Sequence, residues 1–504
     1  MHQEISDTET PKAAPAAQGV VFLSVASFIA LLGGYFFHII AARWLLTADY
    51  GRLVLVLSII TWAENINGAL LAGPVKAISE DHRRFHAAFS MAKKWFLPSG
   101  MIGGMLLFAA APFIAAGFHD QALIALLILA AMEIPLTALL RLAVRYSTAM
   151  RLYSMASAIN SIYSIGRTAL GCSLILIGLG AIGAVAGQVA GTALAAGIGL
   201  VLLIRATRSL PVTNYPQMLS RSVSWAGYSL SYSLGVSTLL AMDMWCVKGL
   251  TPDPAQAGFY GAAFALARTP KFIMQGVAGA VFPRVSQALA QAKKTLAAGV
   301  TEEALRFLLI VMIPLCVLVG ESSSEIVTFL FSEKYTQAGT ALAILMAAIS
   351  IYACFQLMLS IIEAADHPGL RTAFTIGLVP VALGLNFLLI PRYGINGAAL
   401  ATLVSMALGA LAVIPAVLYY TGARLPFWTI IRCSIAGGII YAGAIIWPAE
   451  GWVLVPKLAA LGLVHILILF ISGELGGKDI RAVAEAIPGR TGSYLTRLSK
   501  RFPR

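Results

Sequence analysis

Charged residues are scarce in this chain. Asp, Glu, Lys and Arg make up 11% of its 504 residues, whereas soluble globular proteins carry about 25%. Hydrophobic residues make up 59%, and the mean hydropathy is +0.84. This composition excludes an ordinary soluble protein and predicts an all-α polytopic membrane protein. The net charge of +13 would suggest nucleic-acid binding in a soluble chain, but here it reflects topology, and we expect no nucleic-acid partner.

Motifs of catalysis and cofactor binding are missing from the sequence. It contains no GxxxxGK[ST], HExxH or GxSxG pattern and no Cys-His cluster. The five cysteines form no CxxC pair and fall in apolar segments, which argues against a metal site or a disulfide framework. We therefore expect no enzyme activity, no cofactor and no metal. A membrane polysaccharide polymerase or ligase is a third-ranked alternative, but such enzymes usually have a large external loop, and the longest one here is only 321–339.

Long apolar runs dominate what is present. A transmembrane helix needs about 20 mostly apolar residues, and by this measure we predict fourteen spans. They lie near 20–42, 51–73, 95–118, 122–143, 155–178, 181–204, 227–250, 259–282, 304–321, 340–362, 373–391, 396–419, 431–448 and 453–472.

The distribution of Lys and Arg predicts the orientation. With the N-terminus inside, 26 of the 35 Lys and Arg residues fall in internal loops and tails, Arg141 and Arg145 among them, and six fall outside. The remaining three are within spans. Because cytoplasmic loops carry the excess of positive charge, we expect both termini in the cytoplasm of a multi-pass protein.

Two short patterns recur in the same order. Tyr50-Gly51 opens one helix and Tyr260-Gly261 another, 210 residues apart. "GAIGAVAGQVAG" (180–191) and "GINGAALATLVS" (394–405) both read Gly-x-x-Gly-Ala, 214 residues apart. The two near-equal offsets predict a parallel duplication of six helices, an arrangement common in transporters, whose substrate site lies at the repeat interface.

The repeat and the spans predict the following organisation. The segments are a disordered cytoplasmic tail (1–19), an N-lobe of six spans (20–204), a cytoplasmic linker (205–226), a C-lobe of six spans (227–419), two added spans (420–472) and a basic cytoplasmic tail (473–504).

Two stretches resemble a known family. "ARWLLTADYGRLVLVLSII" and "MDMWCVKGLTPDPAQAGFYGAAFALARTPKFIMQGVAGAVFPRVSQ" are similar to signatures of bacterial polysaccharide transporters, the O-antigen and exopolysaccharide flippases of the multidrug/oligosaccharidyl-lipid/polysaccharide flippase superfamily. The resemblance covers spans one to twelve. It implies transport of undecaprenyl-diphosphate-linked oligosaccharides from the cytoplasmic to the periplasmic leaflet of the bacterial inner membrane, by alternating access. It also implies membrane lipids, and other polysaccharide-assembly membrane proteins, as partners.

Two relatives within the superfamily remain as alternatives. Lipid II flippases also have fourteen spans and a cationic cavity, but their first span carries arginine, whereas here Arg43 and Arg52 only flank the hairpin after it. Cation-coupled multidrug antiporters usually have twelve spans and often a carboxylate in the first, which this chain lacks. The polysaccharide branch therefore fits best.

Arg268 and Lys271 lie within the predicted eighth span, on both sides of Pro270. Residues three apart share a helix face, and charged residues at membrane depth mark functional sites by default. A planar guanidinium can bind a diphosphate bidentately, and an ammonium can add a point charge. The pair is thus the main candidate for substrate binding, with Arg167 of the other lobe as a third cation.

Three carboxylates balance these cations: Glu64, Glu133 and Asp243. They are candidates for ion coupling, since a carboxylate in a partly dry cavity can hold a proton. Alternatively, all six groups only pair with one another, Arg167 with Glu133 or Glu64, and Lys271 or Arg268 with Asp243. Polar residues of spans two and seven either line the cavity or form interhelical hydrogen bonds. These residues are Asn65, Asn67, Tyr228, Ser229, Tyr232 and Ser233.

Overall fold

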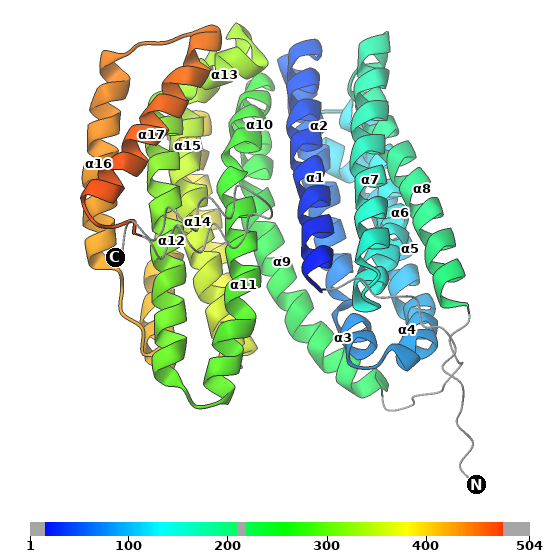
Figure 1. The fold of residues 1–504 in the computed structure, drawn as a ribbon. Coiled ribbons are helices and arrows are strands. Elements are labelled where there is room, and N and C mark those ends of the chain that lie inside the picture. The colour runs from blue at the N-terminus through cyan, green and yellow to red at the C-terminus, as the bar shows by residue number, and fades with distance from the viewer. Residues whose placement is uncertain (1–15, 209–217, 477–504) are drawn as a thin grey trace. The chain divides into compact units, whose positions relative to one another are not determined.

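The computed structural model describes residues 16–208 and 218–476, and every regular element within them is helical (Figure 1). The chain divides into two compact units. Unit 1 contains residues up to Ala265 together with Thr375–Ala398, and unit 2 contains Leu266–Phe374 and the chain from Ala399. The all-α polytopic class predicted from composition is confirmed.

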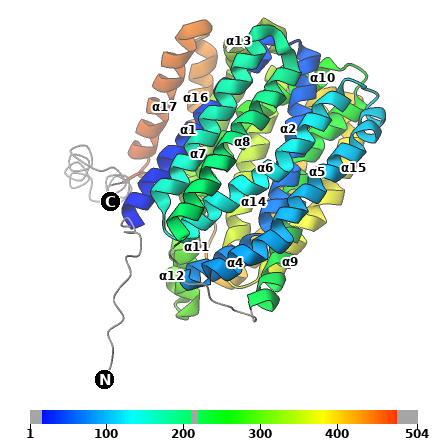
Figure 2. The ribbon, with the colours of Figure 1, turned by 90° about the vertical axis from the view of Figure 1, so that its right-hand side faces the viewer.

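Unit 1 is built from the helices of the first half of the chain. They are α1 (Ala16–Trp44), α2 (Thr47–Ala69), α3 (Ala72–Glu80), α4 (Phe85–Met91), the π-helical turn η2 (Ala92–Phe96), α5 (Leu97–Gly117), α6 (Leu123–Ala149), α7 (Tyr153–Leu174), α8 (Gly180–Thr207), α9 (Met218–Leu250) and α10 (Ala255–Ala267). The short helices α3 and α4 lie at one end of this unit (Figure 1), where Figure 2 shows α4 from the side. There Ile78 and Phe85 pack on Leu142 and Tyr146 of α6.

Unit 2 contains the helices of the second half. They are α11 (Thr269–Ala290), α12 (Lys294–Glu321), α13 (Ser323–Phe331), α14 (Gly339–Ala364), α15 (Pro368–Thr421, whose middle part belongs to unit 1), α16 (Phe427–Ile446) and α17 (Leu454–Ile471). The end of α17 is fixed by Glu474, which accepts hydrogen bonds from Arg306, Thr429 and Arg432. Burial alone would raise the pKa of Glu474, but the bonds from Thr429, Arg306 and Arg432 lower it below the ordinary value.

Ten described helical segments are long and apolar enough to cross a membrane, or eleven if the bent pair α2–α3 is one span. Two of these segments, Tyr153–Thr207 and Pro368–Thr421, are 55 and 54 residues long. Each is twice the length that a bilayer needs, and each contains a glycine outside helical geometry. We divide each of these two long segments at its non-helical glycine and count α10 and α11 together as one interrupted span. The helices then correspond to the fourteen predicted segments. The predicted linker 205–226 is shorter in the structure, because α9 already begins at Met218.

The two breaks occur at matching positions of the predicted repeat. Gly180 has φ +59° and ψ −146°, and Gly394 has φ +57° and ψ −135°. A left-handed φ of this kind favours glycine. Two glycines 214 residues apart therefore turn the chain in the same way between consecutive spans, which supports an internal duplication.

The other pair of repeat motifs meets within unit 1. A Cβ added to Gly51 would lie 2.7 Å from the backbone nitrogen of Gly258, and one added to Gly258 would lie 2.1 Å from the carbonyl oxygen of Thr47. The starts of α2 and α10 thus approach at backbone distance. The tyrosines of the two motifs each bond back to the preceding span: Tyr50 to His38, and Tyr260 to Asp243.

Helices α7 and α8 also pack through glycine. On α8, Gly187 and Gly191 are one turn apart, and a Cβ on either would come within 2.4 Å of the backbone of α7, at Gly171 or Arg167. Small residues four apart allow helices in membranes to approach closely. This packing fixes where α7 presents Arg167.

We expect Gly191→Leu to lower the free energy of unfolding by about 3 kcal/mol, because the side chain has no room against α7. Gly197→Leu on the same helix is the matched control, since a Cβ there has nothing within 4 Å. Thermal unfolding of the purified variants in detergent measures the difference. Equal melting temperatures for the two variants would show that α7 and α8 do not pack as described.

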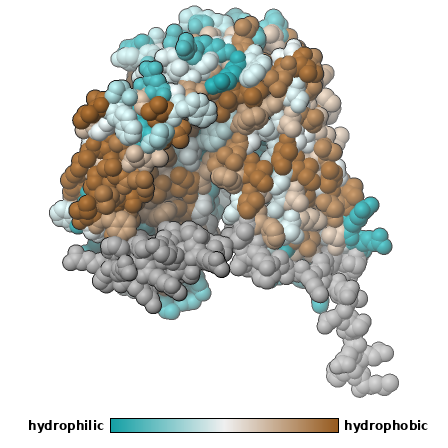
Figure 3. Space-filling view, turned by 45° about the horizontal axis from the view of Figure 1, so that its top comes forward, coloured by the Kyte–Doolittle hydropathy of each residue, from teal (hydrophilic) through white to brown (hydrophobic). Residues whose placement is uncertain are grey.

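Large apolar side chains cover the helix surfaces, as in Figure 3, where hydrophilic ones gather toward the top of the view. On α5 alone Met101, Met105 and Phe113 are exposed. A soluble protein rarely exposes contiguous apolar surface of this extent. These faces therefore contact lipid.

Candidate functional site

The chain is interrupted at Arg268, which separates α10 from α11. Pro270 lies in the first turn of α11, where its missing N–H costs no helical hydrogen bond. The Thr269 hydroxyl donates to the carbonyl of Leu266 at 3.2 Å. The expected kink is thus a one-residue interruption at Arg268, and the freed Leu266 carbonyl accepts from a neighbouring hydroxyl.

Arg268 and Lys271 lie on the two sides of this break and repel each other electrostatically. Both are partly buried, and the Lys271 backbone N–H donates to the carbonyl of Arg268. The break therefore concentrates two positive charges within one helical turn of the predicted eighth span. Both belong to unit 2.

Asp243, the proposed counter-charge for this pair, belongs to unit 1, where it is 2% exposed. It accepts hydrogen bonds from Tyr260 at 3.2 Å and from the amide of Asn386 at 3.1 Å. Neutral donors thus bind this carboxylate from α10 and from α15. The Oδ1 of Asn386 is buried and lacks a hydrogen-bond partner among the described residues.

Glu64 forms a salt bridge that the sequence did not predict. Its carboxylate lies 3.0 Å from Arg141 of α6, and one turn further on Arg145 donates to the carbonyl of Gly68. Arg141 and Arg145, counted among the internal loop charges, both lie on α6, which continues to Ala149. The bridge to Glu64 comes from Arg141, where the sequence had suggested Arg167.

Arg167 of α7 donates instead to two neutral groups, the Tyr163 hydroxyl at 2.6 Å and the Gln188 side-chain oxygen at 3.0 Å. Glu133 accepts from Thr192 at 2.6 Å and interacts electrostatically with Arg167 and Glu64. Together these residues form a buried polar cluster, defined as Glu64, Glu133, Arg141, Tyr163, Arg167, Gln188 and Thr192. Within it Glu133 Oε2 and Gln188 Nε2 lack a hydrogen-bond partner among the described residues.

Interhelical hydrogen bonds involve three of the predicted polar residues of α2 and α9. Ser233 donates to the carbonyl of Asn65, an interhelical hydrogen bond, and Asn67 accepts from Ser99 beside an apolar cavity. Tyr228 is exposed, whereas Ser229 and Tyr232 are partly buried.

Two tryptophans that the sequence analysis did not single out join the same helices. Trp62 donates to Thr238 at 3.0 Å, and Trp245 donates to Ser58 at 2.9 Å. Their rings meet edge to face at 5.8 Å. A tryptophan on each of two polar helices is the signal that could have indicated this contact.

A second charged cluster is centred on Asp120, in the turn between α5 and α6. Asp120 accepts from Arg52 at 2.8 Å and from Lys248 at 2.7 Å, and Arg52 also binds Asp49. Burial would raise the pKa of Asp120, but the hydrogen bonds from Arg52 and Lys248 more than offset this, and its pKa lies below the ordinary value. The cluster ties α2, α9 and the α5–α6 turn together.

The lowered pKa of Asp120 predicts an acid-labile contact. The carboxylate contributes stability that is complete above its unfolded pKa of about 3.8 and is lost as the pH falls through the lower folded value. We expect Asp120→Asn to be less stable than the wild type near neutral pH, and to lose less on acidification below about pH 4. Melting temperatures across that range would contradict this if both proteins lost stability in parallel.

Metal binding receives no support from these clusters. Among the residues that the structure describes, no group of three or more His, Cys, Asp or Glu side chains could hold a metal ion.

Family comparison gives a match over most of the chain. A family model described as "polysaccharide biosynthesis protein" matches residues 40–340. A probable low-salt glycan biosynthesis flippase of Haloferax volcanii, Agl15, is 27% identical over 184 residues. An uncharacterized membrane protein of Methanocaldococcus jannaschii is 28% identical over 177 residues. These matches cover 36% and 35% of this chain and only 39% and 34% of the relatives.

Solved structures match the fold over more of the chain. A lipid II flippase, MurJ, in an inward closed conformation has a TM-score of 0.71 at 16% identity, covering 90% of this chain and 98% of that one. An inward-facing multidrug transporter of the MATE family has a TM-score of 0.62 at 12% identity, covering 80% and 98%. A MOP superfamily transporter from Pyrococcus furiosus has a TM-score of 0.54 at 13% identity, covering 82% and 99%. At these identities the likeness establishes the fold alone.

Proposed function

The chain belongs to the polysaccharide biosynthesis protein family, and we propose that this multi-pass membrane protein is a flippase-type transporter with a specific cargo and direction. The cargo is an undecaprenyl-diphosphate-linked oligosaccharide repeat unit. It moves from the cytoplasmic to the outer leaflet, by alternating access, for exopolysaccharide or O-antigen synthesis. The family and its flippase relatives support transport rather than enzyme activity.

The observation that carries this proposal is the interrupted helix at Arg268. Two cations, Arg268 and Lys271, are placed within one turn of a membrane segment, where charge is costly unless it binds something. A guanidinium can hold two phosphate oxygens at once, and an adjacent ammonium can neutralise a third. A diphosphate headgroup can contact both cations at once, and we assign it to this pair.

The buried polar cluster of unit 1 has a supporting role in this proposal. Arg167 is held by neutral partners, Tyr163 and Gln188, so its positive charge is not cancelled by a direct salt bridge among the described contacts. It is a third candidate for contact with the headgroup or sugars. Glu64, Glu133 and Asp243 serve as counter-charges or couple an ion, and the exposed hydroxyl of Tyr228 is available to sugar.

Location and partners follow from the same proposal. We place the protein in the bacterial cytoplasmic membrane with both termini in the cytoplasm, on the distribution of positive charge. The two six-helix lobes and the two added spans of the predicted organisation remain our proposal, supported by the matching geometry of Gly180 and Gly394. Its partners would be the lipid-linked cargo, membrane lipids and other polysaccharide-assembly proteins.

Reconstitution tests the function directly. Proteoliposomes carrying the purified chain and a fluorescent undecaprenyl-diphosphate-linked oligosaccharide are expected to move the lipid between leaflets, whereas protein-free liposomes do not. Deleting the gene in its host is expected to reduce surface polysaccharide and accumulate lipid-linked units inside. Normal polysaccharide in the deletion strain, together with no movement in proteoliposomes, would rule out this cargo.

A cation-coupled antiporter is the second candidate, and one observation favours it. Glu133 is buried with one carboxylate oxygen lacking a partner among the described residues, as a proton- or cation-carrying group would be. An antiporter would be inactivated by Glu133→Gln but not by loss of Arg268 and Lys271. A flippase would show the reverse order of sensitivity.

A further inference from the structure

Unit 1 contains an apolar cavity that the proposed headgroup site does not use. It has a volume of about 600 Å³ and lies among α2, α5, α6 and α9. One face of α5 lines it at helical spacing, with Ser99, Gly103, Leu106, Ala110, Ile114 and Phe118. Trp62 of α2 and Trp245 of α9 lie on its other side.

The cavity opens onto the lipid-facing surface. Leu106 lines it and is nevertheless 65% exposed, and Met105 beside it is 70% exposed on the outer face of α5. An apolar opening on that surface is in contact with hydrocarbon chains. Its occupant is therefore part of a lipid.

The length of the cavity distinguishes between kinds of lipid. Ser99 and Phe118 are separated by about 28 Å along α5, at about 1.5 Å per residue. The hydrocarbon core of a bilayer is about 30 Å thick, so a chain anchored in one leaflet reaches about 15 Å. An occupant that fills this groove must be longer than an ordinary acyl chain.

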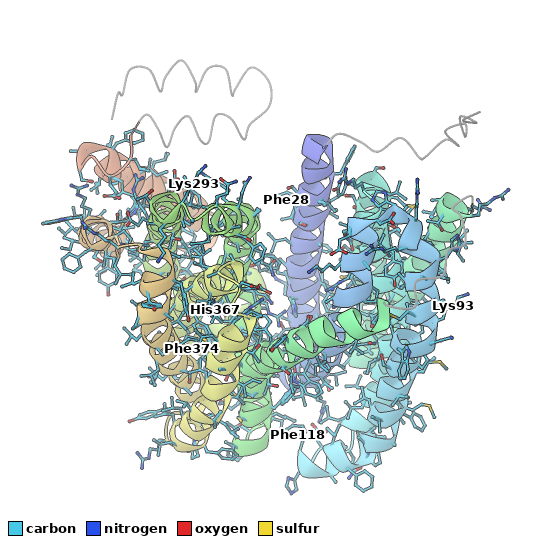
Figure 4. All side chains as sticks on the ribbon, turned by 90° about the horizontal axis from the view of Figure 1, so that it is seen from below. Phe28, Lys93, Phe118, Lys293, His367 and Phe374 are labelled. Carbon is cyan, nitrogen blue, oxygen red and sulfur yellow. The ribbon has the colours of Figure 1, made fainter. Side chains whose placement is uncertain are left out.

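The charges at the two ends of the groove differ. Lys93 and Lys94 precede Ser99 by about 8 Å along the same helical segment and are exposed. Figure 4 shows Lys93 at the edge of unit 1, and no carboxylate pairs with either lysine among the described contacts. At the other end, near Phe118, the positive charges of Arg52 and Lys248 are neutralised by Asp120 and Asp49.

From this geometry we propose that the α2–α5–α9 groove holds the long polyprenyl chain of the lipid-linked substrate, with its phosphate at Lys93 and Lys94. The inference rests on the proposed function, since it names where the tail of that cargo binds. A groove that reaches through both leaflets lets the tail stay in hydrocarbon while the headgroup crosses. The two exposed lysines, of which Lys93 lies over the Phe89 ring, have no carboxylate partner among the described contacts and mark the cytoplasmic end as the loading side.

Lipid retention by the purified full-length chain tests the proposal. Native mass spectrometry would compare undecaprenyl phosphate, farnesyl phosphate and phosphatidylglycerol as probes. We expect the wild type to retain undecaprenyl phosphate at least about tenfold better than either shorter-chain lipid. Equal retention of all three, or a preference for phosphatidylglycerol, would overturn the proposal.

Blocking the groove provides the matched comparison. Ala110→Trp fills it, and Ala109→Trp places the same side chain on the neighbouring lipid-facing position. We expect about a tenfold loss of undecaprenyl phosphate for the first and no loss for the second. Gly103→Leu, which also lines the groove, replaces Ala110→Trp if that variant does not fold. Unchanged retention by a folded, groove-blocked variant would refute the assignment.

Complementation with the same variants separates the two proposals. If the wild type restores polysaccharide and the groove-blocked variant does too, the groove is not on the transport path and the inference fails while the function stands. If the wild type does not restore polysaccharide although the groove still selects the long chain, the proposed function fails and the groove remains.

Discussion

The double variant Arg268→Gln/Lys271→Gln is expected to insert normally in the membrane and to lose transport of the lipid-linked oligosaccharide. The variant removes both cations from the break between α10 and α11 while preserving polar side chains of similar length. Each charge-assisted hydrogen bond to a phosphate contributes about 1.5–3 kcal/mol. Losing two such bonds predicts at least about a hundredfold lower rate in proteoliposomes, and near-complete loss of surface polysaccharide in cells.

Arg284→Gln is the control for this experiment. Arg284 lies on the same helix, α11, and is exposed, so the variant removes a positive charge without touching the break. It should transport like the wild type. If the double variant is present in the membrane at normal levels and also transports normally, the two cations are structural and the headgroup binds elsewhere.

The sequence predicts the structure best for features that depend only on local composition, namely the positions of the helices and of their breaks. Helices were predicted from apolar length, and the breaks at Gly180 and Gly394 were anticipated by the repeated Gly-x-x-Gly-Ala pattern. A bilayer leaves no alternative to helices for such segments, since every backbone group must be satisfied internally. Local chemistry therefore determined most of the architecture.

Pairing between helices was much less predictable. Arg141 was counted as a loop residue because the apolar run that contains it ends near residue 143. The structure extends α6 by one and a half turns, as Leu142 and Tyr146 are buried beneath α3 and α4. Contacts with elements from elsewhere in the chain set where this helix ends, and no local pattern encodes them.

The same reasoning explains the partners of the buried charges. Three acids and three bases within spans suggested mutual pairing, yet Arg167 and Asp243 bind neutral side chains, Tyr163, Gln188 and Asn386 among them. Counting charges cannot tell which neutral side chains also bind each charged group. The sequence does contain a signal for the contact between α2 and α6. Glu64 and Gly68 are one helical turn apart, and so are their partners Arg141 and Arg145. A search for two such pairs on different helices would have suggested this contact.

Glu64→Gln and Arg141→Gln are each expected to lower the stability of unit 1 by about 2 kcal/mol, because each leaves a largely buried charge without its partner. The double variant should regain part of this loss, with a coupling energy of at least about 1 kcal/mol. Thermal unfolding of the four proteins measures the cycle. The exposed pair Glu80–Arg84 is the control, since surface ion pairs contribute little.

Transport by the same four proteins decides what the bridge does. If Glu64 only neutralises Arg141, the double variant regains transport together with stability. A double variant that is stable but inactive would show that one of the two groups takes part in the transport cycle itself. Arg145→Gln then separates the effect of helix packing from the effect of charge. Arg145 donates to the carbonyl of Gly68, so its loss weakens the α2–α6 interface and leaves the charges of Glu64 and Arg141 unchanged. Loss of transport in that variant as well would assign the effect to helix packing, and normal transport would assign it to the carboxylate.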